Sequence, residues 1–316
     1  MNKQLTVIGG GAAGMMAAIC AARRGTAVTL LEPNERLGKK LNITGKGRCN
    51  VTNDAGCEEL LANMPQNGRF LYSAFSRFDG RGTMAFFEEL GVPLKVERGR
   101  RVFPVSDRAF DVSAALEREL RRLRVTLVRD RAVCVLTDET GAVRGVKGEK
   151  GTYPAQAVVL ATGGFAASEP MMREYLPQFA DWINLTTAGA GDTGDGMQMA
   201  LDVGGVFYNA PYVITLGSTS RNGSIAGFCM SVNLWGRMVV NSKAQRFFNE
   251  GYMPYQATVA LSRTEDGIAW ALGDSKFAGA ALLDAAVDGT EVVKADSIEE
   301  LAALMGVDAA TLVKSV

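Results

Sequence analysis

The stretch VIGGGAAG, residues 7–14, decides the fold of this chain. Its glycines at positions 9, 11 and 14 follow an apolar segment and open an Ala-rich segment, which is the spacing of a dinucleotide-binding turn between a strand and a helix. At this spacing Gly9 allows the tight turn, Gly11 lets a pyrophosphate approach the backbone, and Gly14 lets helix and strand pack closely. The unpaired N–H groups at the start of the helix can then bind the anion.

A βαβ unit is expected around this turn, with a strand over residues 4–8, a helix over 12–24 and a second strand over 27–32. Glu32 lies 18 residues beyond Gly14. At the end of the second strand its carboxylate can accept hydrogen bonds from the hydroxyl groups of a ribose. A purely structural glycine turn is the alternative, but the order of strand, helix, strand and acid favours dinucleotide binding.

Composition narrows the class of partner and the compartment. The chain has 316 residues with 34 Lys plus Arg and 34 Asp plus Glu, so no net field attracts nucleic acid or an anionic membrane, and small molecules are the expected partners. Its five cysteines form no CxxC pair, which indicates neither a disulfide framework nor a zinc site and favours a reducing, cytoplasmic location. The pattern leaves the oligomeric state open.

Histidine is absent from the sequence. This absence excludes Ser-His and Cys-His nucleophile pairs, histidine general bases and most catalytic zinc sites. A bound redox cofactor is therefore the expected source of chemistry, because the protein then needs only to position the cofactor, tune it and exclude water.

A second unusual segment is GKKLNITGKGRCN, residues 38–50. Its glycines free the backbone, and its cations, hydroxyl group and amides can donate hydrogen bonds along a phosphate or the edge of a flavin. A solvated basic turn is the alternative.

Later segments predict the rest of the nucleotide-binding fold. Residues 125–129, 132–137 and 142–147 alternate like the strands of a β-meander, and the run AVVLATGG, residues 157–164, predicts a buried parallel strand beside the first strand. The stretch GDTGDG, residues 191–196, leads into an apolar helix. There Asp195 either caps the helix or meets cofactor hydroxyl groups.

Several of these segments, with two further ones, resemble segments of two known families. The segments LGKKLNITGKGRCNVTN (37–53) and GRRVFPVSDRA (99–109) resemble the bacterial flavoproteins grouped with aminoacetone oxidase-like FAD-binding enzymes. The segments VVLATGGF (158–165), GDTGDGMQMA (191–200) and VVNSKAQRFFNE (239–250) resemble the flavoprotein subunits of the fumarate reductase and succinate dehydrogenase family. Both resemblances imply one FAD-binding architecture.

The resemblance implies that FAD lies extended, with its ADP part on the first βαβ unit and its isoalloxazine near residues 44–48. A histidyl linkage to FAD is impossible in a chain without histidine, so the cofactor is expected to be non-covalent, with NADH or NADPH as the candidate electron donor. The implied cofactor residues are Gly9, Gly11, Ala13, Gly14, Glu32, Lys40, Thr44, Gly45, Gly47, Val133, Ala161, Thr162, Gly163 and Asp195.

The chain departs from the fumarate reductases where those enzymes deliver a proton. Pro254 stands at the position of their proton-donating arginine, which argues against fumarate reduction by that route. Tyr252 and Tyr255 flank the gap, and a tyrosine beside a flavin can transfer a proton. With Arg246 they are the catalytic candidates; anchoring of a cap domain by the tyrosines and a hairpin ion pair between Arg246 and Glu250 are the alternatives.

The sequence thus predicts an α/β fold, with a Rossmann-like FAD-binding domain and β-meander over residues 1–205 and an inserted α+β cap or substrate domain over 206–316. Relatives return from the cap to the FAD domain, whereas this sequence stops at Val316, so a missing C-terminal return segment is expected. The predicted function is hydride transfer between flavin N5 and a small organic substrate, with reduction of an activated double bond favoured. An amine-oxidising flavoenzyme, a silent dinucleotide-binding module and an NAD(P)-dependent dehydrogenase are the alternatives.

Overall fold

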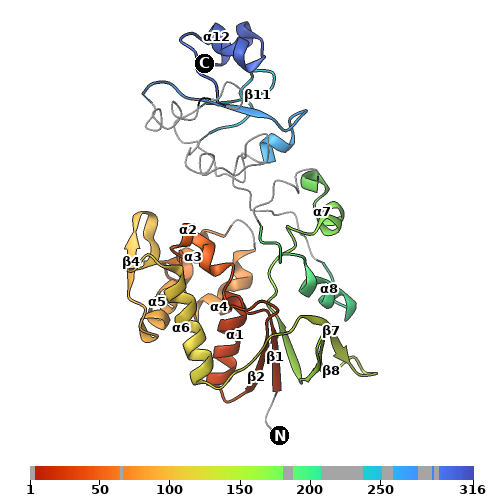
Figure 1. Ribbon diagram of the computed structural model, residues 1–316. Helices are drawn as coiled ribbons and strands as arrows, with labels where there is room; N and C mark the ends of the chain where they lie inside the picture. The colour runs from red at the N-terminus through yellow and green to blue at the C-terminus, as the bar shows by residue number, and fades with distance from the viewer. Residues whose placement is uncertain are drawn as a thin grey trace. The chain divides into compact units, whose positions relative to one another are not determined.

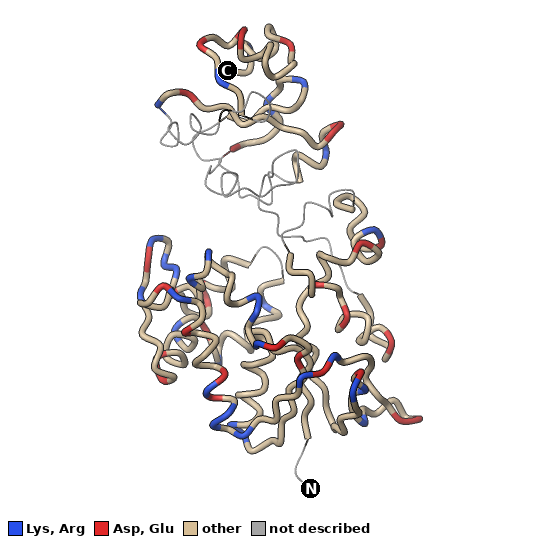
Figure 2. Tube along the Cα trace, in the orientation of Figure 1, with Lys and Arg blue, Asp and Glu red and all other residues tan. Residues whose placement is uncertain are grey.

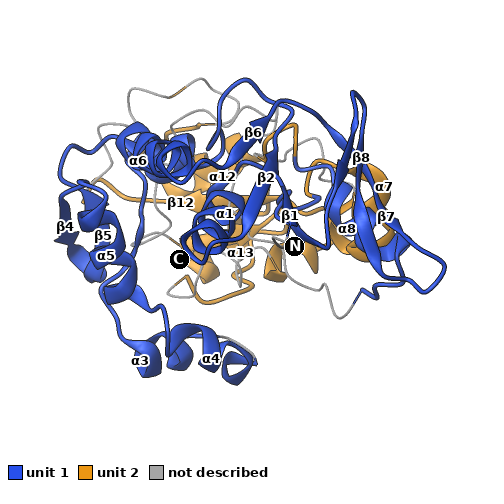
Figure 3. Ribbon diagram, turned by 90° about the horizontal axis from the view of Figure 1, so that it is seen from below, with its two compact units in different colours: residues 1–165, 192–208 blue, residues 166–191, 209–316 orange. Residues whose placement is uncertain are grey.

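The computed structural model describes residues 4–64, 67–180, 188–207, 238–250, 259–276, 287 and 292–316. The chain divides into two compact units (Figure 3). Unit 1 comprises residues 1–165 and 192–208, and unit 2 comprises residues 166–191 and 209–316. The domain boundary at 205/206 stays a prediction.

A four-stranded parallel sheet forms the centre of unit 1 (Figure 1). Its strand order is β10 (Ala157–Leu160), β1 (Gln4–Ile8), β2 (Ala27–Leu31) and β6 (Thr126–Val128). The predicted βαβ unit is confirmed, and so is the placement of the 157–160 strand beside the first strand, with Leu5 paired to Ala157. Because all four strands are parallel, their carboxyl ends meet at one edge of the sheet, which is where such sheets bind ligands.

Successive side chains of each central strand point to opposite faces of the sheet, and both faces are buried. Val7 and Leu30 pack in a core with the helices, whereas their neighbours Ile8 and Leu31 pack in a second core with the meander. Helices α1 and α6 lie on one side of β1, β2 and β6, and the strands β7 and β8 lie on the other (Figure 3). Burial of both faces explains why these strands read as nearly continuous apolar runs.

Two small antiparallel sheets complete unit 1. One has the order β3 (Thr52–Asn53), β5 (Arg101–Pro104), β4 (Leu94–Glu97), and the other is the meander. The sequence predicts a meander with strands over residues 125–129, 132–137 and 142–147. The second and third strands are confirmed, the first is wrong, and the last strand of the meander is missed. The first predicted stretch is β6, which pairs with β2 in the parallel sheet. There Leu127 and Val128 pack against the two cores on opposite faces of the sheet. The meander strands are β7 (Ala132–Thr137), β8 (Val143–Gly148) and β9 (Thr152–Pro154).

The helices of unit 1 are short. The longest that the structure describes, α6, has 14 residues, and no described helix is long and apolar enough to cross a bilayer. The helical segments of unit 1 are α1 (Ala12–Arg23), η1 (Leu41–Ile43), α2 (Thr44–Gly47), α3 (Cys57–Ala62), η2 (Gly68–Leu71), α4 (Tyr72–Phe75), α5 (Gly80–Glu89), η3 (Arg98–Arg100), α6 (Ala109–Arg122) and α8 (Asp195–Asp202).

Unit 2 contains an antiparallel pair and short helices around a core of its own. Val240 of the first strand and Ala244 of the turn that follows it pack against Ala302, Met305 and Leu312 of two C-terminal helices. The Ser297 side chain accepts a hydrogen bond from the amide of Glu300 and so caps the start of the first of these helices. The elements of unit 2 among the described residues are α7 (Glu169–Tyr175), β11 (Met238–Asn241), β12 (Ala269–Leu272), α12 (Ile298–Met305) and α13 (Ala309–Ser315).

Charged side chains of both signs are interspersed along the described trace of unit 1 (Figure 2). This mixing agrees with the equal totals of 34 basic and 34 acidic residues in the chain. A site in this unit must therefore obtain its selectivity from a few placed groups, because no broad field of one sign surrounds it.

Candidate functional site

The glycine turn between β1 and α1 is closed on two sides by backbone. Gly9 has a φ of +106°, which the tight turn requires, and a Cβ there would lie 2.4 Å from the carbonyl oxygen of Ala161. A Cβ at Gly14 would lie 1.8 Å from the carbonyl oxygen of Gly9. The helix therefore packs against the strand at a distance that only glycine permits, as the spacing predicts.

Gly11 differs from these two glycines because it faces open space. Apart from its own chain neighbours, no described heavy atom lies within 4 Å of the position that a Cβ would take at Gly11, and its φ of −77° suits any residue. Gly11 is the N-cap of α1, and no side chain of the described residues caps this helix. The first N–H groups of a helix have no partner within it, so this end can receive an anion.

The Glu32 carboxylate lies beside this turn. Its Oε2 accepts a 2.8 Å hydrogen bond from the amide of Gly10, and its Oε1 accepts bonds from the backbone and side-chain nitrogens of Asn34 at 2.8 and 2.6 Å. The acid is thus fixed at the carboxyl end of β2, next to the amino end of α1. Two fixed acceptor oxygens at this place suit the hydroxyl groups of a ribose.

The segment 38–50 begins at the same turn, because the amide of Gly38 donates to the carbonyl oxygen of Gly10 at 2.8 Å. Lys40 then reaches Asp192, with its Nζ 2.7 Å from Oδ1 and 2.8 Å from Oδ2. A Cβ at Gly163 would lie 2.9 Å from the same Oδ1. Lys40 and Gly163, two predicted cofactor residues, therefore meet at one carboxylate.

Asp192 is a member of this site that sequence reasoning missed. Its side chain is 9% exposed, whereas the Lys40 side chain is 58% exposed. The GDTGDG stretch contains both Asp192 and Asp195, and only Asp195 is predicted from the sequence as a cofactor residue.

Asp195 does not cap the helix that follows it, so the capping alternative is wrong. Gly194 is the N-cap of α8, and Asp195 is the first helical residue. Its carboxylate instead accepts from the Thr193 hydroxyl at 2.5 Å and pairs with Arg131 at 2.7 Å. The pair between Asp195 and Arg131 ties α8 to the residue that precedes the meander, and sequence reasoning missed Arg131 as well.

Thr162 joins α8 to the end of β10. Its hydroxyl oxygen accepts a 3.1 Å hydrogen bond from the amide of Gly196. A Cβ at Gly196 would lie 2.3 Å from that oxygen, so glycine is needed for the approach. The ATGG and GDTGDG stretches are thus adjacent in space.

Val133 lies in an irregular part of the meander. The pairing of β7 with β8 shifts between Ala132 and Cys134, which leaves Val133 in a bulge, and its side chain is exposed. A bulge interrupts the ladder of backbone hydrogen bonds, so the main chain of the extra residue is available to another partner. This arrangement suits the predicted backbone contact to adenine.

Residues 44–49 form a left-handed bend. Gly45, Lys46, Gly47 and Cys49 all have φ between +56° and +83°, although two of them carry side chains. The amide of Cys49 donates to the carbonyl oxygen of Thr44 at 3.0 Å, which closes the bend. No described heavy atom lies within 4 Å of a Cβ position at Gly47, so the backbone there is open to a ligand.

The predicted catalytic residues belong to unit 2. Arg246 forms the hairpin ion pair with Glu250, with Nη2 to Oε2 at 2.6 Å, and Glu250 also accepts from the amide of Val239. The guanidinium lowers the pKa of Glu250 against the opposing effect of its burial. Tyr252, Tyr255 and Pro254 lie outside the described residues.

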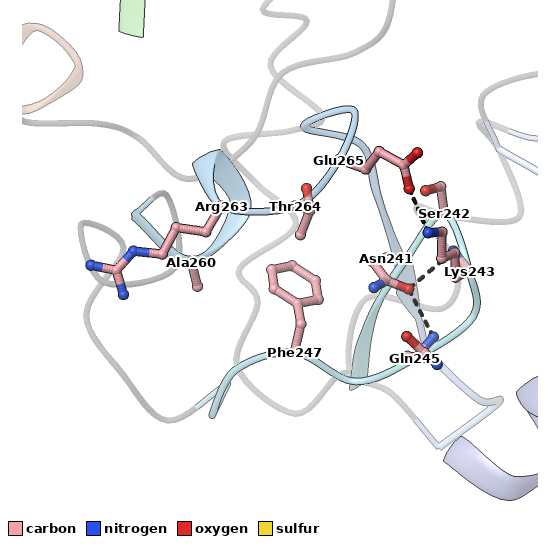
Figure 4. A pocket seen from close by; sticks show the side chains of 9 residues that line it. All are labelled: Asn241, Ser242, Lys243, Gln245, Phe247, Ala260, Arg263, Thr264 and Glu265. Atoms are coloured by element: carbon pink, nitrogen blue, oxygen red, sulfur yellow. Dashed lines mark hydrogen bonds and ion pairs between the residues drawn. The ribbon is translucent and has the colours of Figure 1, made fainter. Parts of the chain in front are cut away.

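Unit 2 also has a shallow depression of about 420 Å³ near its hairpin (Figure 4). Asn241, Phe247, Thr264 and Glu265 line it. Its polar groups largely serve the turn itself, since Oδ1 of Asn241 accepts from the amides of the residues two and four positions later. None of the predicted site residues that the structure describes lines this depression.

The fold and the glycine turn define a Rossmann-type nucleotide-binding protein. Helix α1 is uncapped among the described residues, an acid follows β2, and three glycine-rich stretches meet at the carboxyl edge of a parallel sheet. The chain belongs to the HI0933-like protein Rossmann domain family, whose model matches residues 3–205.

Curated relatives confirm both resemblances seen in the sequence. A 3-dehydro-bile acid delta(4,6)-reductase of Clostridium scindens is 39% identical over 170 residues, which is 53% of this chain and 40% of the relative. The fumarate reductase (cytochrome) of Shewanella frigidimarina is 26% identical over 343 residues, which covers 99% of this chain and 59% of the relative. The chain therefore spans about 40% to 59% of the length of these two relatives.

A solved structure shares the fold. The crystal structure of 3-ketosteroid delta1-dehydrogenase from Sterolibacterium denitrificans, in complex with 1,4-androstadiene-3,17-dione, matches with a TM-score of 0.70 and 19% identity. The match covers 99% of this chain and 78% of that one. At this identity the likeness shows the fold alone, and it agrees with the predicted α/β class.

Proposed function

We propose that this chain binds FAD non-covalently and belongs to a flavin-dependent oxidoreductase. The observation that carries the proposal is the open position over Gly11, at the uncapped amino end of α1, between two glycines whose Cβ positions are blocked by backbone. A turn that served packing alone would have no reason to keep this central position open. A pyrophosphate needs that space.

The chain offers a partner for each part of FAD. The amino end of α1 would hold the pyrophosphate, Glu32 the ribose hydroxyls and the bulge at Val133 the adenine. The open backbone at Gly47 and the neighbouring residues 44–46 would line the isoalloxazine. Lys40, paired with Asp192 beside Gly163, would add one positive charge near the end of β10.

The reaction we propose is reduction of an activated carbon–carbon double bond. FAD, when bound, supplies a hydride from N5 of its reduced ring, and a proton completes the addition to the double bond. Two relatives are reductases by name, one of a bile acid derivative and one of fumarate, which supports this class. Pro254 replaces the arginine expected of the fumarate enzymes, so an unsaturated ketone is the preferred substrate class, with Tyr252 or Tyr255 as the proton donor.

The visible spectrum of the purified chain, after incubation with FAD and gel filtration, tests the cofactor. The expected result is a flavin spectrum that the protein loses on acid precipitation, because the chain has no histidine for a covalent link. Colour that stays with the precipitate contradicts non-covalent binding. A folded chain that retains no flavin contradicts the proposal and favours a silent module.

Anaerobic titration of the flavin-loaded chain tests the reaction. NADH or NADPH is expected to bleach the flavin, and an α,β-unsaturated ketone is then expected to restore its colour without oxygen. Fumarate is the comparison substrate and is expected to act poorly. Bleaching by a small primary amine, with no response to the ketone, assigns an amine oxidase instead.

A further inference from the structure

Arg48 lies within the left-handed bend of residues 44–49, and its side chain contacts a cluster of charges. Its Nε and Nη2 lie 2.9 and 2.6 Å from Oδ1 of Asp107, and Nη2 also lies 2.5 Å from Oε1 of Glu97. The guanidinium carbon lies 4.3 Å from the centre of the Phe103 ring. Lys95 adds a second cation, with Nζ 2.6 Å from Oδ2 of Asp107. We call Arg48, Lys95, Glu97, Phe103 and Asp107 the Arg48 cluster.

The Arg48 cluster connects two stretches that the sequence resemblance singled out separately. Arg48 belongs to GKKLNITGKGRCN, and Phe103 and Asp107 belong to GRRVFPVSDRA. The backbone reinforces the connection, because the amide of Val51 donates to the carbonyl oxygen of Val102 on β5 at 2.9 Å. The small sheet β3-β5-β4 thus holds the bend that precedes β3.

The charges within the cluster stabilise one another. Hydrogen bonds from Lys95 and Arg48 lower the pKa of Asp107, and the bond from Arg48 lowers the pKa of Glu97. The same contacts raise the pKa of Arg48 and that of Lys95. All four groups are therefore charged near neutral pH. The guanidinium has its edge on two carboxylates and its face on an aromatic ring, a geometry that a lysine cannot reproduce.

The bend needs such an anchor because its backbone is unfavourable. Lys46 and Cys49 have φ of +59° and +60°, a region that a non-glycine residue keeps only where its surroundings hold it. Lys46 itself is exposed, so no packing of its side chain explains the conformation. Arg48 lies between these two residues and makes the charged contacts.

We propose that Arg48 is a positioning residue for FAD. Fixed by Asp107, Glu97 and Phe103, it keeps the backbone of residues 44–47 in the shape that receives the isoalloxazine before the cofactor arrives. This inference rests on the proposed FAD binding. It assigns no direct contact between Arg48 and the cofactor, because the guanidinium is engaged on its edge and on one face.

Two variants and two ligands test the proposal. Asp107→Asn and Arg48→Lys each remove part of the anchor, and the binding of FAD and of ADP is measured for each folded variant. ADP probes only the α1 end and Glu32, whereas FAD also requires the bend. We expect affinity for FAD to fall about 10- to 100-fold, the worth of one charge-assisted hydrogen bond, with affinity for ADP unchanged. The visible spectrum of bound FAD should also change.

Controls separate positioning from general stability. Glu117→Gln removes a carboxylate paired with Arg121 at 2.6 Å on α6, and it should leave both affinities unchanged. Asp107→Glu keeps the charge and should recover part of the affinity for FAD. Equal loss of FAD and ADP affinity, or unchanged FAD affinity, overturns the inference. Unfolding of both anchor variants also overturns it, because the cluster would then serve stability.

The same experiment distinguishes failure of the proposed function. If the unmodified, folded chain binds neither FAD nor ADP, the proposal of a flavin site fails. If it binds both and the anchor variants behave like the unmodified chain, FAD binding stands and only the role of Arg48 is lost.

Discussion

The ammonium group of Lys40 lies 2.7 Å from a carboxylate oxygen of Asp192, although 152 residues separate them in the chain. The pair is unequal, because the Asp192 side chain is 9% exposed and the Lys40 side chain is 58% exposed. A buried carboxylate depends on its partner far more than an exposed ammonium group does. We therefore expect the two single variants to lose unequal amounts of stability.

Lys40→Met should destabilise unit 1 more than Asp192→Asn does. The first leaves a buried carboxylate without its cation, which costs about 1–3 kcal/mol. The second leaves an exposed lysine that water can solvate, and the loss should stay below about 1 kcal/mol. Urea unfolding followed by circular dichroism measures both. A larger loss in Asp192→Asn would show that the ammonium group is the dependent partner and contradict this reading.

Glu32 should exclude nucleotides that carry a 2′-phosphate. Its carboxylate is fixed by the amide of Gly10 and by Asn34, so it cannot turn away from a second negative charge without losing those bonds. ADP should therefore compete with FAD for the chain, and adenosine 2′,5′-bisphosphate should not. Displacement of bound FAD, followed by flavin fluorescence, measures the difference. In Glu32→Gln the discrimination should shrink, and equal competition by both nucleotides in the unmodified chain contradicts the assignment.

Glu119 should control the acid side of the stability curve. It is 4% exposed on α6, and bonds from Arg122 at 2.6 Å and from Arg23 of α1 at 2.9 Å lower its pKa from 4.5 to about 2. Because the folded-state pKa is the lower one, its contribution is complete above pH 4.5 and is lost as the pH falls toward 2. Glu119→Gln should flatten the change of melting temperature across this window. An unchanged slope would exclude Glu119 as its source.

The sequence predicts the central βαβ unit and the strand at 157–160 because local patterns determine them. A glycine turn, two apolar strands and an Ala-rich helix need few distant contacts to be recognised, and the register of β1 with β2 and β10 confirms them. The sequence assigns the strand at 126–128 to the wrong sheet because strand pairing depends on distant residues. Alternation of apolar and polar residues indicates a strand but not the strand with which it pairs, which here is β2.

The candidate site is only partly predictable for the same reason. Fingerprint spacing locates Gly9, Gly11 and Gly14, but their different steric surroundings appear only in the fold. Nothing local marks Asp192 as the partner of Lys40, and nothing links Arg48 to Asp107, 59 residues later. Long-range ion pairs of this kind follow from packing and leave no period in the sequence.

Binding of FAD to Gly11→Ala tests the central claim most directly. A Cβ at Gly11 meets no described atom, so this variant should fold and melt like the unmodified chain, whereas Gly14→Ala places a Cβ 1.8 Å from a carbonyl oxygen and should fail to fold stably. The space at Gly11 is the space we assign to the pyrophosphate. We therefore expect FAD to bind Gly11→Ala at least about tenfold more weakly, a loss of about 1.4 kcal/mol, by quenching of flavin fluorescence. Undiminished binding of FAD by a folded Gly11→Ala would contradict the account.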